Sequence, residues 1–207
     1  PLTARMKGVL TRAVQLTARS QSENGGWYYT PESNMDEGSV TVTQIQALRA
    51  CVNAGIYVPK ETIDRAVKYI ELSANPDGGI RYSAARGGEG RPPITAAAIA
   101  TLYNAGRYES KIIDRAKQYV ARTIWPDSKG RGVMGHFFYA HLYLAQVVYR
   151  DGKAKWQPYQ QYIASELMKQ QTAAGAWEGD YVGNVYGTAV ALIILQLPNN
   201  YLPVFQP

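Results

Sequence analysis

The sequence is poor in the residues that build metal sites and disulfide frameworks. It has one cysteine, Cys51, and two histidines, His136 and His141, among 207 residues. A lone cysteine excludes an internal disulfide and a metal site with several cysteine ligands. The two histidines are separated by four residues, which leaves their rings offset around a helix and makes them a poor chelating pair. We therefore expect no metal and no cofactor, and for the histidines either a hydrogen-bonded structural role or, as the alternative, a role in ligand binding.

Long apolar runs are also missing. The strongest run, Thr188 to Leu197 (TAVALIILQL), is well short of the roughly 20 residues that a membrane helix needs. It therefore predicts a buried core helix and no membrane span. A signal peptide is not visible, yet the chain begins at Pro1 and not at Met, so an upstream segment and the cellular compartment both stay open.

Acidic residues are fewer than basic ones, 16 against 22, which gives a net charge of +6. The Lys and Arg residues are scattered through helical segments and form no block, so we expect a solvated basic surface and no nucleic acid partner. A hydrophobic content of 46% with 18% charged residues is typical of a folded globular chain. We expect one domain over residues 1–207, either complete or the C-terminal part of a longer protein.

An internal repeat organises the chain. The segment IDRAVKYI at 63–70 reappears as IDRAKQYV at 113–120, and each follows an Asn-Ala-Gly phrase, at 53–55 and 104–106. Glycine after the last helical residue is a common helix stop. The repeated unit is therefore a helix, a glycine stop, a short link and a second helix.

Extending this frame predicts four units of two helices each. One set of helices carries charged residues around an apolar stripe, which favours an outer layer with one face in solvent. We expect it at residues 4–21, 60–74, 110–124 and 154–171. The other set is rich in small and apolar residues with little charge, which favours a closely packed inner layer. We expect it at residues 39–54, 93–105, 135–150 and 185–197.

A Gly-containing turn separates the two helices of a unit, and it is best preserved at the two ends of the chain. QSENGGW and QTAAGAW share a spaced Gln, Gly and Trp, at Gln21, Gly25 and Trp27 and at Gln171, Gly175 and Trp177. The second unit keeps Gly78 but has Ala74 and Ile80 in place of Gln and Trp. Upstream lies a basic residue followed by alanine, as Arg12-Ala13, Arg65-Ala66 and Arg115-Ala116.

This pattern resembles the QW repeat of the terpenoid cyclase and protein prenyltransferase superfamily. The segment from 138 to 203 is also similar to the C-terminal part of bacterial proteins labelled prenyltransferase and squalene oxidase repeat proteins. The resemblance implies an all-α fold, an α/α toroid in which parallel inner helices surround a central axis and outer helices wrap them. It makes the Gln, Gly and Trp of the turn structural, with Trp27 packed between hairpins and Gln21 bonded to N-terminal amides of the neighbouring helix.

The number of units bears on the partners of the chain. Family members usually close the ring with more hairpins than the four found here. Three alternatives follow: an open arc, the C-terminal part of a longer protein, or association with another chain. Uncapped repeat ends expose apolar surface, which favours self-association.

The catalytic motifs of the family are missing from this chain. Its seven aspartates are isolated from one another, so the Asp-x-Asp-Asp acid of squalene and hopene cyclases is absent. Arg49 stands where a prenyltransferase has the Asp of its Asp-x-Cys zinc ligands, and Val52 follows Cys51 where complement-type thioester domains have Gly-Glu-Gln. The catalytic residues, if any, are therefore unknown.

The leading hypothesis is a repeat domain that binds an apolar or peptide-like ligand, or a protein, on its concave inner face. The residues expected to contribute are Tyr29, Asp36, His136, Tyr139, Tyr143 and Tyr186. Asp36 has an alternative role in capping the helix that follows it. A competing hypothesis is a divergent cyclase-like or glycan-acting enzyme, whose acid lies upstream or at Glu178 and Asp180. A third is a purely structural assembly platform.

Overall fold

The protein is all-helical over the residues that its structure describes. The computed structural model describes residues 2–125, 135–199 and 201, and these form eight α-helices, one short 3-10 helix and no strand. The first set of helices comprises α1 (Leu2–Arg19), α3 (Lys60–Ser73), α5 (Lys111–Thr123) and α7 (Lys153–Gln170). The second set comprises α2 (Gly38–Asn53), α4 (Pro92–Asn104), α6 (Phe137–Arg150) and α8 (Asn184–Gln196), followed by η1 (Leu197–Asn199). Every predicted helix is confirmed, with bounds that differ by at most two residues.

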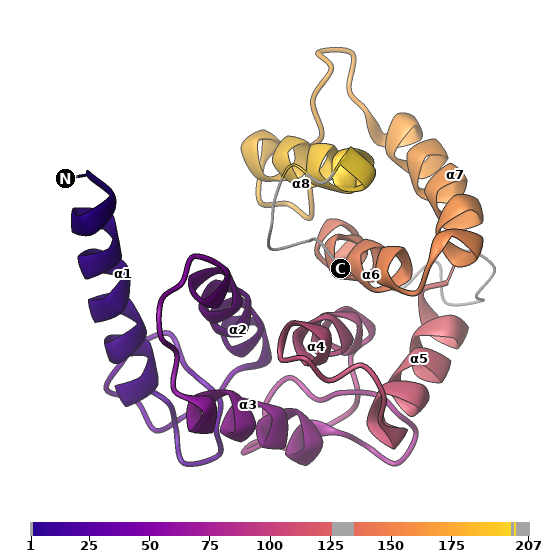
Figure 1. The fold of residues 1–207 in the computed structure, drawn as a ribbon. Helices are drawn as coiled ribbons and strands as arrows, with labels where there is room; N and C mark the ends of the chain where they lie inside the picture. Colours follow the sequence, from indigo (N-terminus) through magenta and orange to yellow (C-terminus); the bar gives the residue numbers. More distant parts are fainter. Residues whose placement is uncertain (1, 126–134, 200, 202–207) are drawn as a thin grey trace.

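The helices form an arc of two layers (Figure 1). Helices α2, α4, α6 and α8 lie on its inner side, α1, α3, α5 and α7 lie on its outer side, and the arc is open between α1 and α8. Along the inner layer α2 packs on α4, α4 on α6 and α6 on α8. The main contacts thus join neighbours along the arc.

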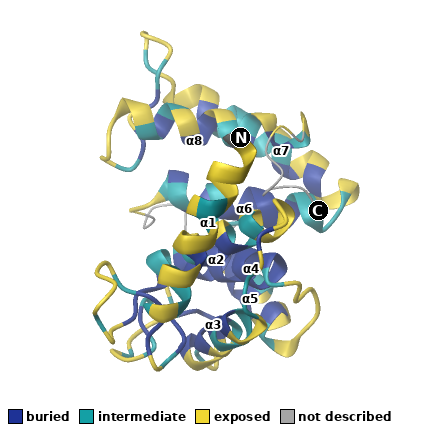
Figure 2. Cartoon of the chain, turned by 60° about the vertical axis from the view of Figure 1, so that its left-hand side comes forward, coloured by how far each residue is buried: buried dark blue, intermediate teal, exposed yellow. Residues whose placement is uncertain are grey.

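The composition of each helix accounts for its layer. In α4 every residue from Ile94 to Asn104 is buried, and alanines at three consecutive positions, 96–98, allow neighbouring helices to approach closely. In α5 burial falls on one stripe, at Ile113, Ala116, Tyr119 and Val120. The burial colouring shows the contrast, since α4 is largely dark blue whereas α1, at one end of the arc, is mostly yellow (Figure 2).

The glycine stops are confirmed. Helices α2 and α4 end at Asn53 and Asn104, and Gly55 and Gly106 follow with φ of 74° and 75°. The amide of Ile56 then donates to the Cys51 carbonyl at 2.9 Å, which closes the end of α2. Glycine adopts this left-handed conformation without the penalty of a Cβ atom.

In the described ranges the Gly-containing turn occurs three times with one backbone pattern, and most of the link after the third outer helix lies outside these ranges. In the first copy the amide of Ser22 donates to the Gly26 carbonyl and that of Gly25 to the Ser22 carbonyl, both at 2.9 Å. The same two bonds recur in the turns at 75–79 and 172–176, at 2.9 to 3.0 Å. Since only backbone atoms make these bonds, the turn at 75–79 forms without the Gln and Trp of the other copies.

A threonine of α2, α4 and α8 fixes the residue that follows each of the three turns. The amide of Trp27 donates to Thr41 Oγ1 at 3.0 Å, and that of Ile80 donates to Thr95 Oγ1 at 2.9 Å. The third copy repeats this bond from Trp177 to Thr188 Oγ1 at 3.2 Å. The threonine therefore belongs to the repeated unit, although the sequence comparison did not single it out.

Trp27 packs between neighbouring hairpins, as expected. It is 2% exposed and lies in a cluster of buried residues from α1, α2 and α3 and from the link before α3: Val14, Ile45, Leu48, Ile56 and Ala66. Its indole Nε1 donates to the Thr17 carbonyl at 2.7 Å, and Trp177 repeats this bond to the Leu167 carbonyl.

The prediction for Gln21 is wrong in its chemistry. The side-chain Nε2 donates to the carbonyls of Gly25, at 2.8 Å, and Thr62, at 2.9 Å. Gln21 thus contacts the first turn of α3 through a carbonyl and not through a free amide. Its Oε1 is buried and accepts no hydrogen bond from the described part of the chain.

Candidate binding site

A pocket of about 450 Å³ lies where α2, α4 and α6 begin. Its apolar wall consists of ring surfaces and aliphatic carbon, from Tyr82, Pro92, Pro93, Ile94 and Tyr139. The polar residues that line it in the described part of the chain are Ser39, Arg91, Thr123 and His136, together with Gly135. Pro92 and Pro93 stand in the first turn of α4, where the N–H that proline lacks has no helical partner to lose. The start of this helix can therefore present apolar rings to the pocket.

Tyr82 and Arg91 form one side of the pocket. The Arg91 guanidinium carbon lies 4.8 Å from the centroid of the Tyr82 ring, within range of a cation–π interaction. The Tyr29 and Tyr82 hydroxyl oxygens are 3.1 Å apart. Burial, and to a lesser extent the neighbouring Glu37 and Tyr29, raise the pKa of Tyr82, so that its hydroxyl stays protonated at neutral pH.

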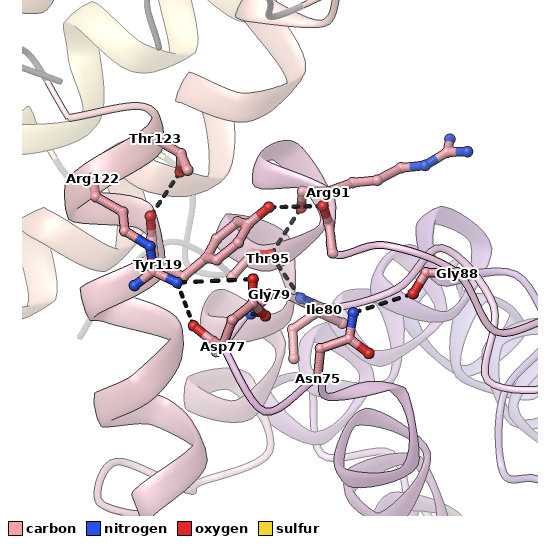
Figure 3. A network of polar contacts seen from close by, with 11 residues as sticks. Asn75, Asp77, Gly79, Ile80, Gly88, Arg91, Thr95, Tyr119, Arg122 and Thr123 are labelled. Atoms are coloured by element: carbon pink, nitrogen blue, oxygen red, sulfur yellow. Dashed lines mark hydrogen bonds and ion pairs between the residues drawn. The ribbon is translucent and has the colours of Figure 1, made fainter. Parts of the chain in front are cut away.

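The backbone that carries Arg91 is held by a network of hydrogen bonds (Figure 3). The Tyr119 hydroxyl donates to the Gly90 carbonyl at 2.7 Å, and Thr95 Oγ1 donates to the Arg91 carbonyl at 2.8 Å. Asn75 Nδ2 donates to the Gly88 carbonyl at 3.1 Å. The Arg91 side chain extends away from this network, as Figure 3 shows. Its base is thus fixed while its charged end is exposed.

His136 and Tyr139 form the opposite side. His136 is the N-cap residue of α6, is exposed and makes no side-chain capping bond. The Tyr139 ring packs edge-on against Tyr143, with centroids 4.9 Å apart. The Tyr139 hydroxyl is buried and has no hydrogen-bond partner among the described residues, and burial raises its pKa. Two of the predicted site residues therefore line the pocket, and Tyr143 supports one of them from behind.

Asp180 reaches the same region from the loop that precedes α8. Its two carboxylate oxygens accept the amides of Phe138, at 3.0 Å, and Tyr139, at 2.9 Å. The Tyr186 hydroxyl donates to Asp180 Oδ2 at 3.4 Å. A carboxylate on the first amides of a helix satisfies otherwise unpaired donors and opposes the helix dipole. The carboxylate that the enzymatic hypothesis needs is thus engaged as the cap of α6, whereas Glu178 is exposed.

Asp36 lies beside this region but not in the pocket lining. It is buried, and its carboxylate accepts hydrogen bonds from Ser83 Oγ at 2.7 Å, the Ala84 amide at 2.8 Å and Asn24 Nδ2 at 3.1 Å. Burial alone would raise its pKa, but these bonds outweigh burial and lower it. The cap of α2 is Glu37 instead, which accepts the amides of Ser39 and Val40.

His141 has the structural role expected for it. It is 1% exposed, its Nδ1 lies 2.9 Å from the Tyr159 hydroxyl, and its ring centroid lies 4.4 Å from that of Phe137. Burial lowers its pKa to about 3, so the imidazole is neutral at physiological pH. It therefore contributes no charge to the site.

Sequence reasoning missed part of the pocket wall. Arg91 precedes α4 as Glu37 precedes α2, and Pro92 and Pro93 begin α4 as Gly38 and Ser39 begin α2. The repeat frame could have indicated them, because residues at equivalent places before each inner helix lie at one end of the inner layer. Their convergence on one pocket depends on how the helices pack, and the pattern of the sequence does not contain that information.

Neither a metal cluster nor a membrane helix is found in the described ranges, 2–125, 135–199 and 201. Within them no three His, Cys, Asp or Glu side chains are grouped so that they could hold a metal ion. The helices of the same ranges are all too short or too polar to cross a membrane.

The sequence was also compared with known proteins. It matches no protein-family model, and no similar sequence is found among curated proteins.

Proposed function

We propose that this chain is a repeat domain of the α/α-toroid type, related to the terpenoid cyclase and prenyltransferase superfamily, that binds an apolar ligand in the pocket at the start of α2, α4 and α6. The pocket lining carries the proposal, because ring and proline surfaces form most of its wall. A volume of about 450 Å³ is within the range of small-molecule sites. The arc of paired helices and its three equivalent turns support the toroid type.

The polar residues of the pocket narrow the ligand class. Among the described residues of the lining, Arg91 supplies a permanent cation, and His136 and Ser39 add hydrogen-bonding groups. A ligand with an apolar body and an anionic end satisfies both parts of this lining. Self-association through the two ends of the arc is the second part of the proposal, supported by exposed apolar residues at both ends, Val9 and Leu16 on α1 and Val185 and Leu192 on α8.

The pocket is tested with 8-anilinonaphthalene-1-sulfonate, which joins aromatic rings to one sulfonate. We expect saturable fluorescence enhancement and displacement by dodecanoate but not by dodecanol. Tyr139→Ala removes a ring from the wall and should weaken binding about tenfold, which corresponds to about 1.4 kcal/mol. Arg91→Gln, at an exposed side chain, should weaken the binding of both anions, the dye and dodecanoate. The matched control is Tyr57→Ala, since Tyr57 is 81% exposed and lies outside the pocket lining.

Circular dichroism of each variant separates loss of binding from loss of fold. Unchanged affinity for both ligands in folded Tyr139→Ala and Arg91→Gln would remove this pocket from the proposal. If Tyr139→Ala does not fold, Arg91→Gln still tests the anionic end.

A further inference from the structure

In two places a turn of one hairpin packs on the outer helix of the next hairpin, and we call such a contact a joint. A Cβ atom added at Gly25 would lie 2.1 Å from the Arg65 carbonyl oxygen, so the turn at 22–26 sits directly on α3. In the same way, a Cβ at Gly78 would lie 2.3 Å from the Arg115 carbonyl oxygen, which places the turn at 75–79 on α5. Each turn thus covers the outer helix of the hairpin that follows it.

The covered face of α3 shows what a joint buries. Thr62, Ala66 and Tyr69 are 5%, 0% and 1% exposed. Gln21 of the turn donates to the Thr62 carbonyl, and the Arg65 guanidinium donates back to the Ser22 carbonyl at 2.7 Å. The joint is therefore both apolar and hydrogen-bonded.

Helix α1 has the same face, but none of the described turns covers it. Its Arg12-Ala13 pair aligns with Arg65-Ala66, which places Val9 in line with Thr62 and Leu16 in line with Tyr69. Val9 and Leu16 are each 50% exposed, and Ala13 is also exposed. Figure 2 shows much of α1 in yellow at its end of the arc.

The turn at 172–176 has the opposite deficiency, because it covers no helix among the residues that the structure describes. The nearest atom to a Cβ at Gly175 is Gln171 Nε2 of the same turn, at 4.0 Å. Gln171 makes only one of the two bonds of Gln21, the one to the Gly175 carbonyl at 3.0 Å. Gln171, Ala173, Ala174 and Gly175 are all exposed. The chain thus carries a complete turn and a complete helix face that do not meet each other.

The free turn at 172–176 and the free face of α1 each differ by one residue type from the two joints, and the two differences are complementary. At the paired joints glycine faces tyrosine, and a Cβ at Gly26 would lie 2.7 Å from a ring carbon of Tyr69. In the free turn Ala176 replaces this glycine, and in α1 Leu16 replaces the tyrosine. The free turn thus carries an additional methyl group, and the free helix face lacks the ring that stands opposite the glycine in a paired joint.

We infer that α1 of one molecule docks on the turn at 172–176 of a second copy of this chain, in the way that α3 docks on the turn at 22–26. In this arrangement Arg12 lies over the turn like Arg65, and Gln171 is free to donate its second bond to the Val9 carbonyl. Helix α2 of one copy then follows α8 of the other in the inner layer. This inference rests on the repeat architecture of the proposed function, but not on the ligand pocket.

The inner helices at the two ends fit such a continuation. Val185 and Leu192 of α8 are 88% and 43% exposed, and Ala189 between them is exposed too. The outer face of α2 presents small residues to solvent, Thr43, Ala47 and Ala50. Within the chain, inner helices already pack on one another in this order. A contact between different surfaces of two copies is heterologous, so that further copies can extend the arc, either into a closed ring or into an open assembly.

The test uses one variant for each surface, with masses from light scattering over a concentration series. Ala13→Arg places a long side chain where Ala66 has no free space, and Ala176→Arg does the same on the turn. The wild type should rise in mass with concentration, whereas each variant alone should stay at the mass of one chain. Their equimolar mixture should double in mass and stop there, because one intact α1 and one intact turn remain. Ala4→Arg, which adds the same charge at another exposed position of α1, should behave as the wild type.

Three outcomes would overturn the inference. The first is a wild type whose mass stays that of a single chain at every concentration, which would leave both surfaces to other occupants. The others are self-association of either variant alone and a mixture of the two variants that does not associate. Circular dichroism checks that each variant is folded, and Ala174→Arg replaces Ala176→Arg if the latter does not fold. Binding of 8-anilinonaphthalene-1-sulfonate to the same variants should be unchanged, since Ala13 and Ala176 do not line the pocket. Lost dye binding with intact assembly would refute the ligand proposal alone.

Discussion

Two glycines at the same place in two turns allow the packing of a joint to be measured apart from its backbone strain. Gly25 and Gly175 have φ of 89° and 78°, so alanine is strained at both. Only at Gly25 would the new Cβ also enter a neighbouring helix, 2.1 Å from the Arg65 carbonyl oxygen. The difference between the two substitutions therefore reports how tightly the turn sits on α3.

The expected costs follow from these two terms. Gly175→Ala should lower the free energy of unfolding by about 1 to 2 kcal/mol, the usual penalty of a left-handed conformation for a residue with a Cβ. Gly25→Ala should cost about 1 to 3 kcal/mol more, because the turn and α3 must move apart. Gly78→Ala should match Gly25→Ala, since its Cβ would lie 2.3 Å from the Arg115 carbonyl oxygen.

Urea denaturation followed by circular dichroism measures these differences, at a protein concentration where the chain is monomeric. Equal slopes of the unfolding free energy against urea would show that the variants unfold from equally compact states. If Gly25→Ala and Gly175→Ala cost the same within about 0.5 kcal/mol, the turn does not press on α3 and the reasoning fails.

Two further predictions concern buried side chains. Trp27→Ala should lower the free energy of unfolding by about 3 to 5 kcal/mol in the same urea assay, because Trp27 is 2% exposed. The control Tyr57→Ala, at an 81% exposed side chain, should change this free energy little. An unchanged free energy of unfolding in Trp27→Ala would mean that Trp27 is not structural. His141 has a pKa of about 3 in the folded protein, below that of an unfolded histidine, so the unfolded state binds an additional proton at acid pH. Stability should therefore fall by up to about 1.4 kcal/mol per pH unit between roughly pH 6.5 and 3, and a folded His141→Gln variant should lack this contribution to the slope.

The eight helices could be predicted because each type of helix occurs several times in the sequence. The glycines at 55 and 106 mark the ends of helices. The outer helices have an apolar stripe among charged residues, whereas the inner helices are apolar nearly all round, and this difference predicts the two layers. The turn at 75–79 was harder to recognise, since it has lost Gln and Trp. Its backbone hydrogen bonds do not depend on those side chains, so the three turns are more alike in structure than in sequence.

The candidate site was less predictable for a different reason. Tyrosines are common in this chain, and only packing decides which of them faces a cavity. Tyr139 lines the pocket, while Tyr143 is buried behind it and Tyr186 bonds Asp180. Asp36 was chosen because it precedes α2, yet its carboxylate is turned toward Ser83 and Ala84. Charge and position in the sequence do not indicate which way such a side chain points.

Because each hairpin packs mainly on its neighbours along the arc, whole hairpins can be gained or lost during evolution. Since the main contacts join successive elements, no hairpin specifies how many others the chain must contain. Duplication of one unit would reproduce a joint that already exists, with its glycine turn, its Arg-Ala pair and its threonine. Deletion of one unit would rejoin two surfaces that are already of the matching kind. Proteins of this architecture can therefore lengthen and shorten in steps of about 50 residues without inventing a new interface, as unit lengths of this order are typical of helical repeats.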